Sequence, residues 1–332
     1  MLPIETWIQI NNSYHLTSRF NWQTLGRIFG PENGPSWMKT HAQVPTPLLK
    51  EEEELIRVYF ATRPEPGKTL IGYVDLNLHN PKKILMVSQE PVLALGKPGT
   101  FDEHGVMPSC AVRVGNDIYL YYSGWSRAVG VPYTNSTGLA VSHDGGRTYE
   151  KISDGPVLSK SIVDPYSATS PFVLRLEEGW LMWYCSGTGW ISYKGKMEHV
   201  YDIKLARSVD GIYWTPTGEV ALEVNETEQA ITRPWIDFYD GHWYLYYCYR
   251  KAVDFRDGIG AYRLGLAVSS DLKRWVPNSG ACLDWPREDW DLQAQSYPAV
   301  ATLSGRRFLF HNGNGFGTYG FGVWKEEGSI NE

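Results

Sequence analysis

The chain has 332 residues, a formal net charge of −6 and an aromatic share of 14%, with 14 Trp and 21 Tyr. An acidic chain without a block of Lys or Arg is not expected to bind nucleic acid. The sequence has neither a basic leader followed by an apolar core nor an apolar run of about 18 residues. We therefore expect a cytoplasmic protein with no signal peptide and no membrane partner.

The four cysteines, at positions 110, 185, 248 and 282, fit reduced thiols in that compartment. Cys185 and Cys248 lie 63 residues apart at equivalent positions of a repeat described below, as small core residues would. No Cys-x-x-Cys pair or other metal-ligand spacing occurs. We expect no metal site and no cofactor.

One stretch, Gly105–Trp125, returns four more times along the chain. Each copy has an apolar run, a short polar turn and a second strand rich in aromatic residues. The equivalents of Ser109 follow at intervals of 62, 62, 63 and 64 residues; the five reference positions are Pro47, Ser109, Pro171, Pro234 and Pro298. A fixed period of this length indicates a repeat architecture.

In chain order, the aromatic second strands are predicted at 56–61, 118–123, 180–185, 243–248 and 307–312. A third strand of each copy is predicted at 70–74, 137–142, 203–208, 264–269 and 319–324. Each repeat has room for four short strands, which is one propeller blade. We therefore expect an all-β fold, a five-bladed β-propeller with four antiparallel strands per blade, in one domain covering 1–332. The N-terminal segment, Trp7–Ile10 or nearby, is expected to close the ring as the outer strand of the last blade.

A turn of the Ser-x-Asp type follows the third strand in three repeats, at 142–149, 208–214 and 269–275. The side chains of Asp144, Asp210 and Asp271 are expected to accept hydrogen bonds from backbone amides, which is a structural role. In a four-stranded meander these turns lie on the face opposite the links into the first strand. Long loops expected at 123–136, 186–202, 249–263 and 311–318 lie on the same face as those links.

Functional side chains are expected where these links and long loops converge on the axis. Arg233, directly before a strand proline, is the strongest single candidate for ligand binding, although a structural ion pair is an alternative. Each of the other candidates has a turn or cap role as its alternative. The predicted binding residues are His41, Gln43, His104, Arg127, Trp190, Glu198, Tyr201, Arg233, Arg250, Tyr262, Arg263, Gln293, Asn312 and Asn314.

Three acids on the same face are candidates for catalysis: Asp102, Glu103 and Asp164. Ionisable side chains beside the axis are costly to bury unless they serve a purpose. Asp164 precedes a proline, so a simple turn opening is the alternative for it. We expect these three residues to line one axial pocket together with Arg233. Their carboxyl groups would act there as the general acid and the general base.

The blade layout, the strand proline and the Ser-x-Asp-Gly turns together resemble the propeller glycosidases of glycoside hydrolase families 43, 32, 68, 117 and 130. The resemblance covers the whole chain and implies a carbohydrate-active protein. Families 43 and 32 place Asp, Asp and Glu at the starts of the first strands of blades 1, 3 and 4. The matching positions here are Thr46-Pro47, Ser170-Pro171 and Thr232-Arg233-Pro234, and none is a carboxylate. The family's catalytic residues therefore do not transfer to this chain.

These observations predict a glycoside hydrolase-like enzyme that uses carboxylate acid and base chemistry on a glycan or sugar conjugate. Glycoside hydrolysis needs two carboxyl groups across the scissile bond. One alternative is a non-catalytic propeller that binds a sugar or sugar nucleotide in cytoplasmic polysaccharide metabolism. A second is a transferase or lyase acting on an acidic sugar, with proton transfer by His or Tyr. A third is a propeller that binds another protein.

Overall fold

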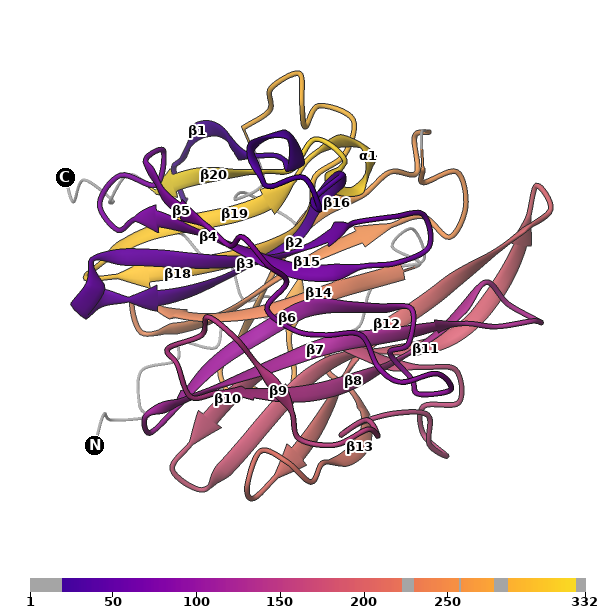
Figure 1. Cartoon of the computed structure of the whole chain (residues 1–332). Coiled ribbons are helices and arrows are strands. Elements are labelled where there is room, and N and C mark those ends of the chain that lie inside the picture. Colours follow the sequence, from indigo (N-terminus) through magenta and orange to yellow (C-terminus); the bar gives the residue numbers. More distant parts are fainter. Residues whose placement is uncertain (1–19, 223–229, 257, 278–285, 327–332) are drawn as a thin grey trace.

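The computed structural model describes residues 20–222, 230–256, 258–277 and 286–326. The described chain is built of β-strands, with one four-residue helical turn, α1 (Asn314–Gly317), and two 3-10 turns, Pro31–Asn33 and Glu51–Glu53. The strands form three four-stranded sheets and one eight-stranded sheet, which we divide in chain order into five units of four strands each. The first strands of consecutive units are in contact, and Figure 1 shows units 1, 2 and 3 one after another.

Unit 1 contains β2 (Thr40–Lys50), β3 (Leu55–Arg63), β4 (Leu70–Asn77) and β5 (Ile84–Val87). Unit 2 contains β6 (Gly105–Val114), β7 (Asp117–Arg127), β8 (Tyr133–Ser142) and β9 (Glu150–Lys151). Unit 3 contains β10 (Ala168–Leu176), β11 (Gly179–Tyr193), β12 (Lys196–Ser208) and β13 (Thr215–Val220). Unit 4 contains β14 (Ala230–Tyr239), β15 (His242–Arg250), β16 (Arg263–Ser269) and β17 (Val276–Pro277). Unit 5 contains β18 (Ser296–Leu303), β19 (Arg306–Asn312), β20 (Phe321–Glu326) and β1 (Trp22–Phe29).

Within each unit, neighbouring strands are antiparallel, as the repeat predicts. Units 2 and 3 are also joined by one parallel pair, Ala168 with Ser136. The outer place in unit 5 is taken by β1, which pairs with β20 from Trp22 opposite Glu326 onward. The segment Trp7–Ile10, predicted for this place, lies outside the described residues.

Two segments predicted as long loops are strands instead. The ladder between β7 and β8 continues to Arg127 opposite Tyr133, and that between β11 and β12 continues to Tyr193 opposite Lys196. Both continuations are antiparallel pairing, regular in the first and with one register shift between Gly187 and Gly189 in the second, so each hairpin is longer than predicted. The prediction was wrong because the polar composition of these segments resembles that of loops.

In units 4 and 5 a two-residue turn links the first and second strands. Asp240 and Gly241, between β14 and β15, both have positive φ, 49° and 75°. Ser304 and Gly305, between β18 and β19, repeat this geometry with 46° and 79°. Two successive positive φ angles define the turn whose twist matches that of the flanking strands.

The first strand of every unit has a β-bulge near its start. In four units a residue at this bulge, shortly before the strand proline, has a positive φ: Val44, Ser170, Arg233 and Tyr297. In three of them its backbone N–H reaches a side chain on the second strand of the preceding unit. Val44 N–H donates to Asn312, Ser170 N–H to Ser123 and Tyr297 N–H to the Cys248 sulfur. We call these contacts the inter-unit joints.

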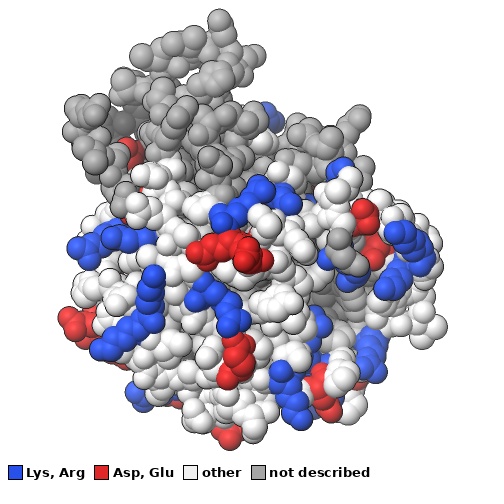
Figure 2. Space-filling model, turned by 90° about the horizontal axis from the view of Figure 1, so that it is seen from above, with Lys and Arg blue, Asp and Glu red and all other residues white. Residues whose placement is uncertain are grey.

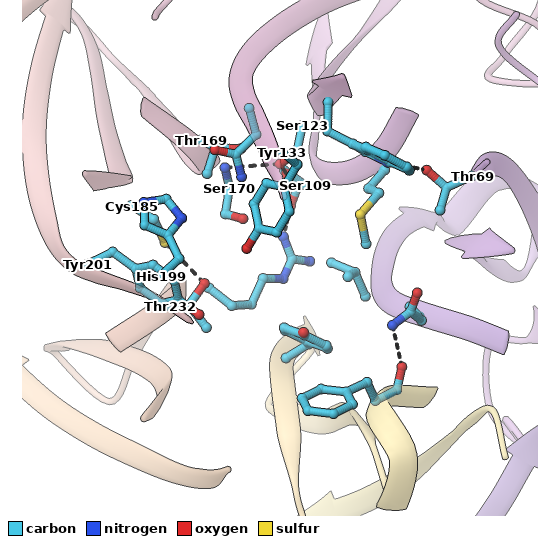
Figure 3. A pocket seen from close by; sticks show the side chains of 18 of the residues that line it. Thr69, Ser109, Ser123, Tyr133, Thr169, Ser170, Cys185, His199, Tyr201 and Thr232 are labelled. Atoms are coloured by element: carbon cyan, nitrogen blue, oxygen red, sulfur yellow. Dashed lines mark hydrogen bonds between the residues drawn. The ribbon is translucent and has the colours of Figure 1, made fainter. Parts of the chain in front are cut away.

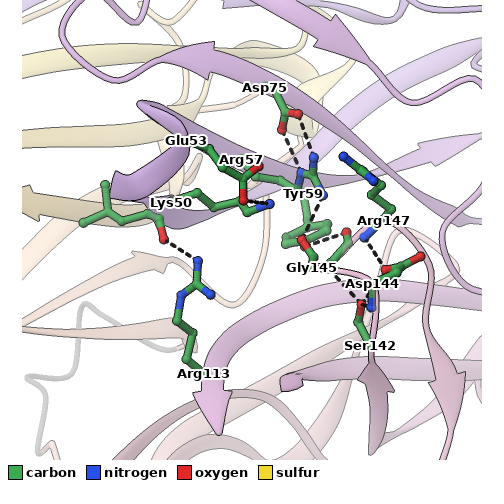
Figure 4. A network of polar contacts seen from close by, with 12 residues as sticks. Lys50, Glu53, Arg57, Tyr59, Asp75, Arg113, Ser142, Asp144, Gly145 and Arg147 are labelled. Atoms are coloured by element: carbon green, nitrogen blue, oxygen red, sulfur yellow. Dashed lines mark hydrogen bonds and ion pairs between the residues drawn. The ribbon is translucent and has the colours of Figure 1, made fainter. Parts of the chain in front are cut away.

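The Ser-x-Asp turns lie at the opposite ends of the third strands. Asp144, after β8, accepts hydrogen bonds from Arg147 N–H at 2.9 Å and Thr148 N–H at 3.0 Å. Nearby, Arg57 forms a buried ion pair with Asp75 and donates to the carbonyl of Gly145, which ties unit 1 to this turn of unit 2 (Figure 4). The predicted structural role of the turns is confirmed.

Aromatic and aliphatic side chains fill the space between units. The largest fully buried ones include Trp183, Tyr121, Tyr184 and Trp324. Some of these residues also make specific bonds across units, as Tyr121 OH does with the Gly211 carbonyl at 2.7 Å. Such packing fixes the first strands of the units and the residues that they present to the axis.

Candidate functional site

A pocket lies where the five units converge. Residues of every unit line it, among them Arg63 from unit 1, Tyr133 from unit 2, Glu198 from unit 3, Arg250 from unit 4 and Tyr297 from unit 5. It lies at the start of β8 and β12, while the Asp turns follow the ends of those strands. The sorting of the two faces predicted from the strand order is therefore confirmed for these strands.

Small polar side chains make up one part of the lining. Figure 3 shows them around the same space as Tyr133, His199 and Tyr201. The Ser109 and Ser123 hydroxyls lie 3.2 Å apart, and the Cys185 sulfur lies 3.1 Å from the Thr232 hydroxyl. The group comprises Ser109, Ser123, Thr169, Ser170, Cys185 and Thr232. These groups can exchange hydrogen bonds with ligand hydroxyls.

Arg233 is the most deeply buried cation of the lining, with no exposed surface. It extends from unit 4 to two other units: it donates to the Ser109 carbonyl, to the Pro45 carbonyl at 3.1 Å and to the Thr46 hydroxyl at 2.9 Å. All three acceptors are neutral oxygens. Burial lowers the pKa of Arg233 to about 10, so the side chain stays charged at neutral pH.

Glu198, on β12, forms a two-bond ion pair with Arg256. Arg256 Nε lies 3.1 Å from Oε1 and Nη2 lies 2.8 Å from Oε2. The Glu198 side chain is nearly buried, whereas that of Arg256 is about half exposed. The carboxylate is thus held at the pocket wall by a cation that solvent reaches.

An aromatic and arginine cluster forms the adjoining wall. Tyr201 OH and Tyr262 OH lie 2.6 Å apart, and Arg250 Nε donates to Tyr262 OH at 3.1 Å. The Arg250 guanidinium also lies over the Phe255 ring, 3.6 Å from its centroid. Aromatic rings with polar tips in this arrangement suit the apolar face and the hydroxyls of a sugar.

His199 lines the pocket and stacks on Trp190, with ring centroids 4.2 Å apart and planes 4° apart. Burial and, to a smaller extent, the charge of Arg250 lower the pKa of His199 to about 4. The imidazole is therefore neutral at pH 7 and can accept a proton or a hydrogen bond.

Cations outnumber carboxylates in this pocket. Five of its residues are Lys or Arg, while Glu198 is the one carboxylate among the described residues that line it; the cations are Arg63, Lys68, Arg233, Arg250 and Arg256. Arg256 pairs with Glu198, and Lys68 pairs with Glu65 at the surface. Within the described part of the chain, Arg63, Arg233 and Arg250 have no carboxylate at ion-pair distance.

Six of the predicted binding residues line the pocket: Gln43, Glu198, Tyr201, Arg233, Arg250 and Tyr262. Gln43 connects units, since its amide donates to the Phe316 carbonyl at 2.5 Å and its oxygen accepts from Arg63 at 3.2 Å. Trp190 stands behind His199 and is not part of the lining.

The predicted catalytic acids Asp102, Glu103 and Asp164 do not line the pocket, which contradicts the expectation that they meet there with Arg233. Asp102 is buried, accepts from Tyr122 OH at 2.8 Å and lies 2.6 Å from Lys151 Nζ. Glu103 instead accepts from the Gly99 N–H at 2.8 Å.

Asp164 repeats the arrangement of Asp102 one unit later. It has no exposed surface and accepts from Tyr184 OH at 3.0 Å and Ser186 Oγ at 2.6 Å. Lys204 Nζ lies 3.5 Å from the same carboxylate. The link before each first strand turns these carboxylates toward the Tyr of their own unit, which explains why position alone misplaced them.

The remaining predicted binding residues hold loops or joints and do not line the pocket. His104 stacks on Trp125, and Arg127 N–H approaches the His104 ring at 3.5 Å. His41 lies between the hydroxyls of Thr40 and Thr318.

The other four take part in hydrogen bonds to backbone groups of unit 5 and the adjoining units; they are Arg263, Gln293, Asn312 and Asn314. Asn312 is fully buried and donates to the carbonyls of Ala42 and Gly320. Asn314 accepts from Gln293 N–H at 2.9 Å, and Arg263 donates to the Gln293 carbonyl.

Several lining residues were not singled out from the sequence, notably Arg63, Tyr133 and Arg256. Arg63 ends the second strand of unit 1, at the repeat position that Arg250 occupies in unit 4. That shared position is the signal that could have identified it. Tyr133 and His199 lie on strands that the sequence predicted as loops.

Among the described residues, no cluster of three or more His, Cys, Asp or Glu side chains is placed to hold a metal ion. The described chain also has no helix of the length and hydropathy that a membrane span requires.

No protein-family model matches the chain. It is 34% identical over 304 residues to the uncharacterized protein Rv1502 of Mycobacterium tuberculosis strain H37Rv, covering 91% of this chain and 98% of that protein. The uncharacterized protein MT1551 of Mycobacterium tuberculosis strain CDC 1551 matches to the same extent.

Several solved structures have the same fold at low sequence identity. A structure described as a glycoside hydrolase superposes with a TM-score of 0.70 and 15% identity, covering 95% of this chain and 94% of its own. A glycosyl hydrolase from Bacteroides ovatus gives 0.67 and 14%, with 93% and 94% covered. An exo-1,5-α-L-arabinanase from a bovine ruminal metagenomic library gives 0.58 and 16%, with 86% and 91% covered. The chain therefore belongs to the family of the mycobacterial protein Rv1502, and its fold is that of the glycoside hydrolase-like β-propellers.

Proposed function

We propose that this protein is carbohydrate-active and binds an anionic sugar, or a sugar conjugate with an anionic group, in the axial pocket. The observation that carries the proposal is the charge of the lining: five Lys or Arg against one Glu among the described residues. The chain as a whole is acidic, and on the face seen in Figure 2 basic and acidic side chains are interspersed. The local excess of positive charge thus favours an anionic ligand.

The remainder of the lining suits a sugar. Tyr201, Tyr262, Phe255 and Phe316 offer ring faces or edges, while the small hydroxyl side chains offer donors and acceptors. Sugar-binding sites combine an apolar surface with a few placed polar groups.

Binding without hydrolysis is the function that this geometry supports best. A glycosidase needs two carboxyl groups across the scissile bond, and Glu198 is the one carboxylate among the described lining residues. The acids predicted as catalytic bond to other groups outside the lining, as Asp102 and Asp164 do to tyrosines of their own units.

His199 favours lyase chemistry as a second candidate. Removing the proton beside a sugar carboxylate requires a cation to neutralise that group and a base to take the proton. His199 lines the pocket, and its imidazole offers a proton acceptor there, although the lowered pKa makes it a weaker base than a free imidazole. The arginines of the described lining that have no carboxylate at ion-pair distance offer the cation.

The architecture that this proposal assumes is a single domain, 1–332, in which the five units are the blades of a closed ring. Pairing of β1 with β20 supports closure by the N-terminal strand. The joints between successive units support the ring order.

Calorimetry with matched sugar pairs tests the proposal: glucuronate against glucose, galacturonate against galactose, glucose 6-phosphate against glucose, and UDP-glucuronate against UDP-glucose. We expect at least one acidic member to bind about tenfold or more tightly than its neutral partner, a difference of about 1.4 kcal/mol. The preference should weaken as salt is added. Equal affinities within every pair would refute an anionic ligand.

The second candidate is tested in the same samples by following the ultraviolet absorbance of unsaturated uronates on a polymeric acidic glycan. A rise that is abolished in His199→Ala would establish the lyase. Binding without such a rise would leave sugar binding as the function.

A further inference from the structure

Arg233 shares its backbone geometry with equivalent residues of three other units and differs from them in its side chain. The positive φ at the bulge recurs at Val44, Ser170 and Tyr297, with φ between 50° and 57°, against 61° at Arg233. The bulge is therefore a general device of the fold. What unit 4 adds is a guanidinium, placed by this bulge at the axis.

The charge of Arg233 is not compensated by the described chain. Its three bonds go to two carbonyls and a hydroxyl, and no described carboxylate lies within ion-pair distance. A buried charge without a counter-ion is costly. The three acceptors and the Trp235 ring, whose centroid lies 5.1 Å from the guanidinium, offset part of this cost, and a negatively charged group would offset more of it.

Donor groups of Arg233 also remain unused. A guanidinium has five N–H donors, and three bonds leave two without a partner in the described structure, Nε–H and one on Nη1. A buried donor without a partner lowers stability. Arg233 belongs to the pocket lining although its side chain has no exposed surface, so a bound group reaches these donors once the lining side chains in front of them move aside.

We infer that Arg233 binds the anionic group of the ligand, a carboxylate or phosphate oxygen, at the buried end of the pocket. The inference rests on the proposed function and adds the residue and the orientation. In this orientation the anionic group lies at the buried end of the pocket, and the sugar ring lies against the wall formed by Tyr201 and Tyr262. Charge-assisted hydrogen bonds to such oxygens are about twice as strong as neutral ones.

A structural role is the competing explanation, because Arg233 also connects units 1, 2 and 4. The two roles make different predictions. A side chain that only holds the pocket together affects acidic and neutral sugars alike, whereas a binding group affects the acidic member of a pair.

Three variants of the full chain separate these roles. Arg233→Met removes the charge at similar length, and Arg233→Lys keeps the charge without the planar donor set. Arg113→Met is the matched control, because Arg113 is an exposed arginine on the outer end of β6 near the network in Figure 4. Dissociation constants are measured for the acidic and neutral member of the best pair, with thermal unfolding as the measure of folding.

We expect Arg233→Met to weaken the acidic sugar at least tenfold and to leave the neutral sugar within about twofold. Arg233→Lys should retain the preference for the acidic sugar with at least fivefold weaker binding. Comparing the dissociation constants for glucuronate and glucose 6-phosphate shows whether the anionic group is a carboxylate or a phosphate. Arg113→Met should match the unaltered protein.

The outcomes also separate this inference from the function beneath it. If the unaltered protein shows no preference for any acidic sugar, the proposed function fails. If it shows the preference and Arg233→Met keeps it, only the inference on Arg233 fails. Should Arg233→Met not fold, Arg233→Lys decides, since binding equal to that of the unaltered protein would overturn the role of the guanidinium.

Discussion

Two buried ionisable side chains, Asp164 and Arg233, differ in whether the surrounding protein satisfies their charge. Asp164 and Arg233 are both ionisable and both fully buried. Asp164 has a tyrosine, a serine and a lysine around its carboxylate, while Arg233 has neutral acceptors and unused donors. A buried ion whose bonds are all made serves the fold, whereas one with unused donors needs an explanation, and a ligand is the one that we infer for Arg233.

Asp164→Asn is therefore expected to lower stability with no effect on sugar binding. The amide disturbs the bonds from Tyr184 and Ser186 and removes the charge facing Lys204. The loss should be about 1–3 kcal/mol, as for a disturbed buried polar group, measured by urea unfolding. Asp154→Asn, at an exposed ion pair with Lys97, is the control and should change stability by less than about 0.5 kcal/mol. Loss of turnover or binding at unchanged stability would restore a catalytic role for Asp164.

At the scale of elements, the two ends of the third strand have separate tasks. The start of β8 carries Tyr133 into the pocket, and its end leads to the Asp144 turn. The same division holds for β12, with Glu198 at one end and Asp210 beyond the other. Substitutions in the turns should thus change the free energy of unfolding and leave ligand affinity unchanged.

Asp144→Ala is expected to lower the free energy of unfolding by about 0.5–2 kcal/mol, as the loss of a capping side chain does. The backbone amides of Arg147 and Thr148 lose their acceptor. Chemical denaturation measures the change, with Glu219→Ala at an exposed position of β13 as the control. Ligand affinity should stay constant, and a drop in affinity would argue against the separation of the two ends.

The strands themselves could be predicted because each carries its own signal: a two-residue alternation, aromatic residues and a turn, repeated five times. The pocket could be predicted only in part. A bulge shifts the register of the first strand, and a shift of one residue sends a side chain to the other face. The prediction for Arg233 agrees with the structure because Arg233 directly precedes the strand proline, whose position the repeat fixes. Asp102 and Asp164 lie before the bulge, where the geometry of the link decides which way their side chains point.

At the scale of the whole molecule, two buried histidines and the partly buried His41 make stability depend on pH. Burial lowers the pKa of His41 and His199 to about 4 and that of His311 to about 3. Each is neutral in the folded chain but takes up a proton below about pH 6.5 when unfolded. Their contribution to stability is complete above pH 6.5 and is lost as the pH falls toward 4.

We expect the free energy of unfolding to decrease between pH 6 and 5 and the decrease to be smaller in His199→Asn. One buried histidine contributes a slope of about 1.4 kcal/mol per pH unit in this range. Urea unfolding at several pH values measures the slope, and His79→Asn, at an exposed position after β4, serves as the control. Parallel curves for His199→Asn and the unaltered protein would show that His199 is not held neutral.

The joints between units have a consequence for thiol chemistry. The Cys248 sulfur accepts the Tyr297 N–H, and the Cys110 sulfur accepts the Val173 N–H of the next unit. Cys185, on the second strand of unit 3, is buried as well. Burial raises the pKa of Cys110 and Cys185 to about 11 and that of Cys248 further still. Only the thiolate reacts with alkylating reagents, so these three side chains stay inert while the units remain joined. The rate at which they are alkylated therefore measures how often the units separate.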